Sequence, residues 1–175
     1  MSGSTATNGN DTLSGTPGND FIDLLGGSDS YLGLDGHDSI LGNDGDDTIN
    51  GGAGDDSIVG GSGNNNLFGE AGNDTFLADA TPNSASDGYY DGGAGNDVFR
   101  LYEGADTVIG GAGFDRVEFL SDHLSINLGD VPNEQASGID HLVLAGENQS
   151  LFLSETDVLR LTDFGVLAIS GRTGN

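Results

Sequence analysis

The sequence predicts an all-β fold: a parallel β-roll, which is a right-handed β-solenoid, followed by a C-terminal β-rich cap with one short helix. Three observations lead to this prediction. Glycine, aspartate and an apolar residue recur at fixed places of nine-residue lines, and fixed-period self-similarity is typical of repeat architectures. The eighth place is consistently apolar, as expected of a short strand with one inward side chain. After residue 118 the repeat decays into irregular apolar runs.

Eleven lines make up the repeat. Eight of them run without a gap from Ala6 to Leu77, and three more run from Gly92 to Glu118. The fourth place is always glycine, which predicts a positive φ or a backbone approach too close for a Cβ. The sixth place is aspartate in every line except the one that has Asn65. The eighth-place residues, which we expect in the core, are Leu13, Ile22, Tyr31, Ile40, Ile49, Ile58, Leu67, Phe76, Phe99, Val108 and Val117.

Six residues of turn and three of strand predict a chain reversal every nine residues. Lines two apart then stack in one parallel sheet, 18 residues apart in the sequence and about 4.8 Å apart in space. The predicted organisation is a first roll block at 6–77, an enlarged turn at 78–91, a second roll block at 92–118 and a cap at 119–175. At the end of the enlarged turn, the segment from Tyr89 to Asp91 fits a strand with Tyr90 inward.

The cap retains strand-like runs without the repeat. These runs lie at 125–127, 139–144, 150–153 and 166–170. The first keeps the strand phase of the roll, with Ile126 inward. Ser154, with Asp157 three residues later, is typical of a helix start and predicts a short helix over 154–161. Because a solenoid must protect its open edge, we expect this segment to cover the last strands of the roll.

The charge balance restricts the partners. The chain has 29 acidic and four basic residues, for a net charge of −25. Residues 1–91 contain 16 acidic residues and no basic one. Nucleic acid and anionic membranes require a basic surface, so both are excluded as partners, and no apolar run is long enough for a membrane span. There is no cysteine to form disulfides. Multivalent cations are the natural partner of such a chain.

The sixth-place aspartates are predicted to form two ladders, one on each edge of the roll. Stacked carboxylates repel one another, and Ca²⁺ suits the gap because it accepts six to eight carboxylate and carbonyl oxygens in flexible geometry. Mg²⁺ fits less well because it demands tighter octahedral coordination. Zinc and copper are disfavoured, since the chain has no cysteine and no suitably spaced histidines. We expect ions to link successive coils and to make folding dependent on calcium.

The segment Gly51–Val59 matches the nonapeptide Gly-Gly-x-Gly-x-Asp-x-apolar-x, and so do Gly92–Arg100 and Gly110–Glu118. This motif resembles the calcium-binding repeat of the RTX (repeats-in-toxin) family. The resemblance covers residues 6–118. It implies a secreted or cell-surface protein of a Gram-negative bacterium, exported unfolded by type I secretion machinery. It also implies a monomeric spacer or accessory module of an adhesin or exoenzyme that binds about five to eight Ca²⁺ ions.

The resemblance further implies the ligands. The carboxylates would come from Asp11, Asp20, Asp29, Asp38, Asp47, Asp56, Asp74, Asp97, Asp106 and Asp115. Backbone carbonyls would come from Gly33, Asp35, Gly42, Asp44, Gly51, Ala53, Gly60, Ser62, Gly69, Ala71, Gly92 and Ala94. Asn65 should weaken its site, and Asp106 lacks a partner on its edge. We expect Asp74, Asp97 and Asp115 to share one edge despite the enlarged turn, and the cap to bind no calcium.

Two alternatives remain open at this point. The chain has no Gly-x-Ser-x-Gly nucleophile motif, no His-Glu-x-x-His metalloprotease motif and no Walker motif. We therefore expect no enzymatic activity. Polysaccharide binding, as in the rolls of alginate-modifying enzymes, is the alternative function. Its candidate residues are Tyr89, Tyr90, Arg100, Tyr102 and Arg116, although a pair between Arg100 and Glu118 would explain that arginine more simply. The C-terminal region is interpreted as an internal cap of a longer protein, with a secretion signal as the alternative.

Overall fold

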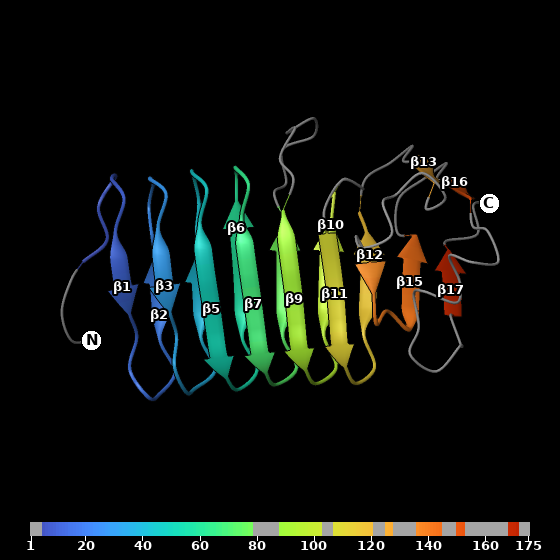
Figure 1. The fold of residues 1–175 in the computed structure, drawn as a ribbon, viewed down its shortest axis with the longest axis horizontal. Coiled ribbons are helices and arrows are strands. Elements are labelled where there is room, and N and C mark those ends of the chain that lie inside the picture. Colours follow the sequence, from blue (N-terminus) through green and yellow to red (C-terminus); the bar gives the residue numbers. More distant parts are fainter. Residues whose placement is uncertain are drawn as a thin grey trace.

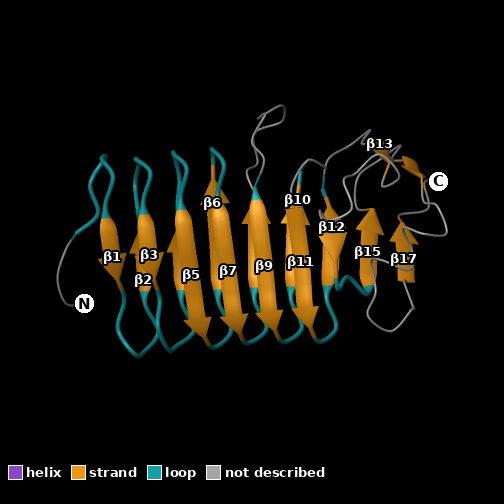
Figure 2. Ribbon diagram, viewed as in Figure 1, coloured by secondary structure: helices purple, strands orange, loops and turns teal. Residues whose placement is uncertain are grey.

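The computed structural model describes residues 5–78, 88–102, 107–120, 125–127, 136–144, 150–152 and 168–171. All regular elements in these ranges are β-strands, and nearly all of them belong to two parallel sheets that face each other (Figures 1 and 2). The predicted all-β, parallel β-roll is therefore confirmed. The helix expected over 154–161 lies outside the described residues. Within the described ranges there is no helix long and apolar enough to cross a membrane.

The first sheet contains seven strands, which come mostly from alternate lines of the repeat. In spatial order they are β1 (Thr12–Ser14), β3 (Ser30–Leu32), β5 (Thr48–Ala53), β7 (Asn66–Ala71), β9 (Tyr89–Ala94), β11 (Thr107–Ala112) and β14 (Ala136–Ser137). Figure 1 shows these strands stacked along the long axis of the molecule, beginning at the N-terminal end. Each coil therefore contacts mainly its two neighbours, as expected of a solenoid.

The second sheet contains eight strands. In chain order they are β2 (Phe21–Asp23), β4 (Ser39–Leu41), β6 (Ser57–Gly61), β8 (Thr75–Ala78), β10 (Val98–Leu101), β12 (Arg116–Phe119), β15 (His141–Leu144) and β17 (Ala168–Gly171). The last two show that the sheet continues into the segment expected to be the cap. A separate two-stranded sheet pairs β13 (Ser125–Asn127) with β16 (Ser150–Phe152). The strand at 125–127 is thus present as predicted, but it does not pair with a strand of the roll.

The register follows the nine-residue period. Thr12 pairs with Ser30 in the first sheet and Phe21 pairs with Ser39 in the second, so each coil takes 18 residues. The enlarged turn does not disturb this stacking, because Asn66 pairs with Tyr89. Several strands exceed the predicted three residues, because turn residues also join the backbone ladder. The N–H of Gly36, for example, donates to the carbonyl of Ala53 at 2.7 Å.

The fourth-place glycines meet both expectations for that position. From Gly27 to Gly113, those in the described residues have φ between 111° and 145°. A Cβ on Gly36 would lie 2.6 Å from the carbonyl carbon of Gly18 in the preceding coil. Replacing these glycines would therefore strain the backbone and separate adjacent coils. Gly18, near the N-terminal end, is different, because nothing lies within 4 Å of its Cβ position.

The core is the row of eighth-place side chains between the sheets. All of those predicted are buried, apart from the partly buried Ile22. Tyr90 is only 4% exposed, which confirms its predicted inward position after the enlarged turn. The Phe76 and Phe99 rings stack at the centre, with centroids 4.8 Å apart and planes 8° apart. Outside this row the core also contains Leu24, Leu101, Phe119, Ile139 and Leu142, which the repeat pattern did not predict.

Candidate metal sites

The sixth-place aspartates lie in the turns, directly before the strands that they lead into. Asp47 precedes β5 and Asp74 precedes β8, and the side chains of both are buried. The same is true of Asp29, Asp38, Asp56, Asp97 and Asp115. Burying one ionised carboxylate is costly, and burying a column of them is unfavourable without compensating charge.

Backbone hydrogen bonds connect these aspartates into two ladders. In each ladder, the N–H of one sixth-place residue donates to Oδ1 of the equivalent residue one coil further along, at 2.7–2.9 Å. The first ladder consists of Asp11, Asp29, Asp47 and Asn65. The second consists of Asp20, Asp38, Asp56, Asp74, Asp97 and Asp115. The expectation that Asp74, Asp97 and Asp115 share one edge is therefore confirmed.

The other carboxylate oxygen of these aspartates, Oδ2, differs from Oδ1 in its hydrogen bonding. Oδ2 has no hydrogen-bond partner in Asp29, Asp38, Asp47, Asp56, Asp74 or Asp97. Buried polar atoms almost always have a partner, and each exception requires an explanation such as an ion. A row of unpartnered, buried carboxylate oxygens indicates cation sites.

Glycine at the first place of a line provides the space for such a cation. A Cβ on Gly92 would contact Asp97 Oδ2 and would lie 2.5 Å from the carbonyl oxygen of Gly110 in the next coil. A Cβ on Gly69 would contact Asp74 Oδ2 and would lie 2.7 Å from the Gly92 oxygen. We call this space, between the Oδ2 of one line and the first-place carbonyl of the next coil, the cradle.

The cradles bring predicted carboxylates together with first-place carbonyls, all of which except that of Gly110 were predicted as ligands. The pairs are Asp20 with the oxygen of Gly33, Asp38 with that of Gly51, Asp47 with that of Gly60, Asp74 with that of Gly92, and Asp97 with that of Gly110. Across the described ranges, no group of three His, Cys, Asp or Glu side chains could hold a metal ion. A cation here would therefore be held largely by backbone carbonyls, and carboxylate plus carbonyl oxygen is the ligand set of Ca²⁺.

The comparison with known families agrees with this geometry. The RTX calcium-binding nonapeptide repeat matches residues 5–40, 41–76 and 85–117, and these ranges contain both ladders. The chain belongs to the RTX calcium-binding repeat family. No curated protein matches it. The repeats of this RTX chain are therefore calcium-binding repeats, and Ca²⁺ is the cation that its cradles fit.

The third-place carbonyls of the RTX turns already have one partner each. The oxygens of Asp44, Ala53, Ser62, Ala71 and Ala94 accept an N–H from the fourth-place glycine of the preceding coil, at 2.7–3.0 Å. A carbonyl oxygen has two lone pairs, so this hydrogen bond leaves one for a cation. The prediction that these carbonyls are ligands is compatible with the structure.

Burial raises the pKa of the ladder carboxylates. The pKa of Asp74 rises to about 7 and that of Asp97 to about 6, and the first cause in both cases is desolvation. Desolvation also raises the pKa of Asp38, Asp47 and Asp56. In the folded roll, protons would therefore partly neutralise Asp74 and Asp97 near neutral pH, and a cation in their cradles would displace these protons.

In the first two lines of the repeat, a threonine donates hydrogen bonds to Oδ2 of the sixth-place aspartate. Thr16 donates to Asp20 Oδ2 from its N–H at 2.6 Å and from its hydroxyl at 3.0 Å, and Thr7 holds Asp11 Oδ2 in the same way. The backbone hydrogen bond from Thr16 is the main cause of the lowered pKa of Asp20. These threonines occupy the second place of the line, where the RTX motif has glycine. The two ladders therefore begin with carboxylates that the chain itself stabilises.

Asn65 changes the cradle of its line. Its Nδ2 donates to the carbonyl of Gly61 at 3.2 Å, and it would lie 3.0 Å from a Cβ on Gly60. A neutral donor thus faces the space that a carboxylate oxygen faces in neighbouring lines. Asn65 still accepts the N–H of Asp47 through Oδ1, so the ladder is continuous there.

Replacing Asn65 by aspartate should add a calcium site. The new Oδ2 would face the space beside Gly60, so we expect one more bound Ca²⁺ per chain and folding at a lower Ca²⁺ concentration. Isothermal titration calorimetry measures both the stoichiometry and the affinity. The matched control is Asn64→Asp, which adds the same charge at an exposed neighbouring position. Equal effects of the two substitutions would show that net charge, and not the cradle, controls binding.

Asp140 is a candidate ligand that the nine-residue pattern did not predict. Its Oδ2 accepts the N–H of Asp115 at 3.0 Å, and the residue is only 7% exposed. The second ladder thus continues past Glu118, into the segment where we expected no calcium. Gly138, Asp140 and Leu142 repeat the fourth-, sixth- and eighth-place pattern and could have revealed it. Asp106, another predicted ligand, lies outside the described residues.

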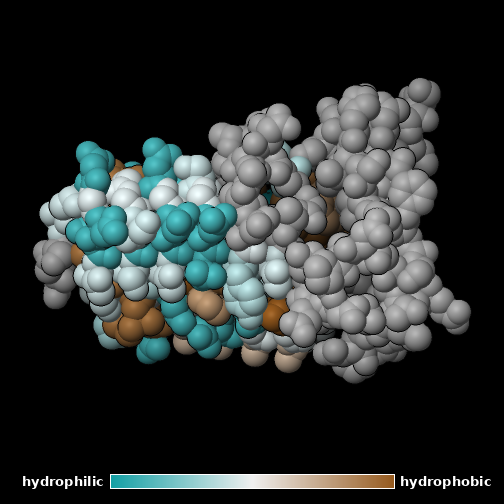
Figure 3. All heavy atoms as spheres, turned by 45° about the horizontal axis from the view of Figure 1, so that its top comes forward, coloured by the Kyte–Doolittle hydropathy of each residue, from teal (hydrophilic) through white to brown (hydrophobic). Residues whose placement is uncertain are grey.

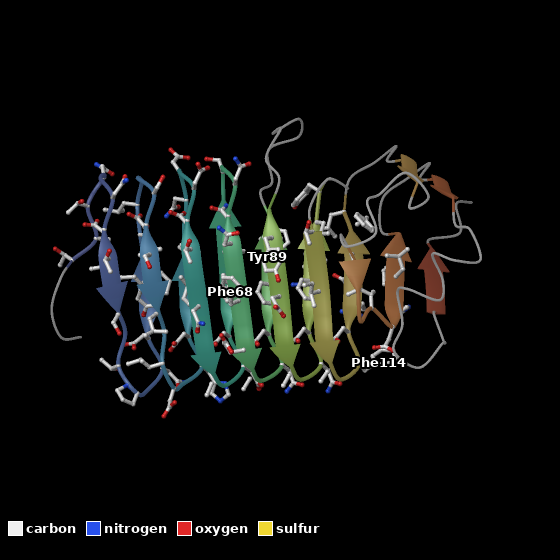
Figure 4. The ribbon with its side chains drawn as sticks, viewed as in Figure 1. Phe68, Tyr89 and Phe114 are labelled. Atoms are coloured by element: carbon white, nitrogen blue, oxygen red, sulfur yellow. The ribbon has the colours of Figure 1, made fainter. Side chains whose placement is uncertain are left out.

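The residues proposed for polysaccharide binding do not form one surface. Tyr90 is in the core, whereas Tyr89 lies on the first sheet beside Phe68, with ring centroids 5.7 Å apart (Figure 4). Arg100 and Arg116 belong to the second sheet, and both pair with Glu118, at 2.9 and 2.8 Å. The simpler explanation of Arg100 is thus confirmed. Tyr102 is partly buried just after β10. The described surface in Figure 3 is white to teal over most of its area, with a brown, hydrophobic patch at the lower left.

Proposed function

We propose that this RTX chain is a non-catalytic module of a secreted protein, and that calcium outside the cell switches it from an unfolded chain to a β-roll. The observation that carries the proposal is the column of buried carboxylates whose Oδ2 atoms have no partner. Without calcium, these charges oppose the packing that the core favours. With calcium, each ion joins two coils, and coupling between coils makes folding cooperative.

The composition supports this switch. The chain has a net charge of −25 and no disulfide, and each nine-residue line adds about one core side chain. Ordering one backbone residue costs about 1–2 kcal/mol, whereas burying one large apolar side chain contributes only about 1.5–3 kcal/mol. A ligand that binds only the folded state supplies the additional stabilisation. Export in an unfolded state through type I secretion would follow, since calcium is scarce inside the cell and abundant outside.

Circular dichroism and small-angle X-ray scattering of the full chain, in EGTA and across a Ca²⁺ titration, test the proposal. We expect an expanded coil in EGTA and a compact β-rich particle in Ca²⁺, with Mg²⁺ at equal concentration much less effective. The folding midpoint should lie at about 0.1–1 mM, the range of extracellular calcium modules. An unchanged β-signal in EGTA would refute the calcium switch. A midpoint below about 1 µM, the range of intracellular calcium proteins, would refute its coupling to secretion.

A further inference from the structure

We propose that the hydroxyl oxygen of Tyr31 lines the calcium site at Asp20, so that a core side chain completes the first cradle of the second ladder. This inference rests on the calcium binding described under the proposed function. Tyr31 is an eighth-place residue on β3 and is only 4% exposed. The other eighth-place residues are aliphatic or phenylalanine, apart from Tyr90. A hydroxyl group within this row is therefore unusual.

The position of the hydroxyl is defined by its neighbours. The Cβ position of Gly15 lies 2.6 Å from the Tyr31 hydroxyl oxygen, 2.7 Å from Asp20 Oδ2 and 2.7 Å from the carbonyl oxygen of Gly33. Asp20 Oδ2 and the carbonyl oxygen of Gly33 correspond to the atoms that define the other cradles. Three oxygens of different origin, a carboxylate, a backbone carbonyl and a phenol, thus surround one small space.

The other tyrosine of the core differs in the atoms closest to its cradle. Tyr90 on β9 stands next to the cradle at Gly69 as Tyr31 stands next to the cradle at Gly15. The three atoms closest to the Cβ position of Gly69 are Oδ2 and Cγ of Asp74 and the carbonyl oxygen of Gly92. At Gly15, by contrast, the phenol oxygen is the closest of the three atoms.

The chemistry of the phenol suits a neutral ligand. A tyrosine hydroxyl ordinarily has a pKa of about 10, so the phenol is an uncharged ligand at neutral pH. Asp20 Oδ2 accepts the N–H and the hydroxyl of Thr16, so an ion here would share this oxygen with Thr16 and would depend more on the two neutral oxygens. A hydroxyl oxygen has lone pairs that can accept a cation, and Ca²⁺ accepts neutral oxygens beside carboxylates.

This ligand would connect an ion at the edge of the roll with the core. Removing only the hydroxyl, by Tyr31→Phe, leaves the ring that packs between the sheets and is therefore expected to leave the fold intact. The lost oxygen should weaken the ion at Asp20, while the cradles further along the ladder are unchanged. The matched control is Tyr89→Phe, because Tyr89 lies on the outer face, where its hydroxyl contacts Asp91 at 3.5 Å.

Terbium binding to the full chain tests the assignment, because Tb³⁺ replaces Ca²⁺ and emits when a nearby tyrosine is excited. Tyr31→Phe should lose the part of the sensitised emission that comes from the ion at Asp20, while emission sensitised by Tyr90 remains, and calorimetry with Ca²⁺ should show one site weakened about three- to tenfold. Tyr89→Phe should match the wild type in both measurements.

Three other results would overturn the assignment. Unchanged emission and affinity in Tyr31→Phe would place the hydroxyl away from the ion. Lost emission with unchanged affinity would place Tyr31 near the ion but not on it. Both of these results leave the proposed function intact, provided that circular dichroism still shows calcium-dependent folding. A wild-type chain that binds neither Tb³⁺ nor Ca²⁺ would instead refute the proposed function, and this site with it.

Discussion

Replacing Gly92 by alanine should eliminate one calcium site and destabilise the roll by about 3 kcal/mol or more. The added Cβ would contact Asp97 Oδ2 and would lie 2.5 Å from the Gly110 oxygen, the two atoms that face the cradle. Gly92 is not among the positive-φ glycines, so the effect arises from the occupied space and not from backbone strain. One ion at 100 times its Kd contributes about 2.7 kcal/mol, and overpacking adds about 1–3 kcal/mol.

The control for this substitution is Gly18→Ala. Gly18 is also a glycine of the repeat turn, but nothing lies within 4 Å of its Cβ position, and its φ is not positive. We expect a change of less than about 0.5 kcal/mol and the full number of bound ions. Calorimetric stoichiometry and chemical unfolding at a fixed Ca²⁺ concentration compare the two variants. If both lost the same stability and no ion, the cradle would not be the calcium site.

Replacing Phe76 by alanine should destabilise the roll by about 3–5 kcal/mol, as large-to-small substitutions of buried aromatic residues do. Phe76 is completely buried and stacks on Phe99 at 4.8 Å, in the middle of the second sheet. Each coil is stabilised mainly by its neighbours, so we expect a cavity there to uncouple the two halves of the roll. Thermal unfolding in saturating Ca²⁺ should show a lower midpoint and a broader transition.

Phe114→Ala is the matched control for the core substitution. Phe114 lies in a turn and is 55% exposed (Figure 4). Removing its ring should change stability by less than about 0.5 kcal/mol, with the same calcium stoichiometry. Comparable losses in the two variants would mean that stability depends on calcium alone and that the stacked rings contribute little.

The sequence predicted most of the roll because a solenoid converts sequence period into spatial neighbourhood. Asp56 and Asp74 are 18 residues apart, and the structure places them in consecutive coils of one ladder. The enlarged turn did not disturb the prediction, since Tyr90 restores the inward phase before the second block. Asp140 was missed because it follows Asp115 by 25 residues instead of 18. A longer loop shifts the phase of the repeat without changing the stacking that the backbone ladder enforces.

In the segment after residue 118, the sequence also failed to predict which strands pair. The runs at 125–127 and 150–152 form strands as expected, but they pair with each other, while β15 and β17 extend the second sheet. Strand propensity is a local property that a short apolar run reveals. The choice of pairing partner depends on edges that several segments can occupy, and no fixed period specifies it outside the repeat.

The sequence by itself therefore determined which residues stack, which side chains enter the core and which carboxylates form the ladders. Each of these follows from periodicity and from the alternation of side chains along a strand. Only the tertiary structure decided which carboxylate oxygens lack a partner. Thr16 satisfies Asp20, and Asn65 turns its amide toward Gly61, whereas Asp97 Oδ2 faces a carbonyl of the next coil. The physical reason is that each of these contacts depends on the particular side chain or carbonyl that the fold brings against the carboxylate, which the nine-residue period does not specify.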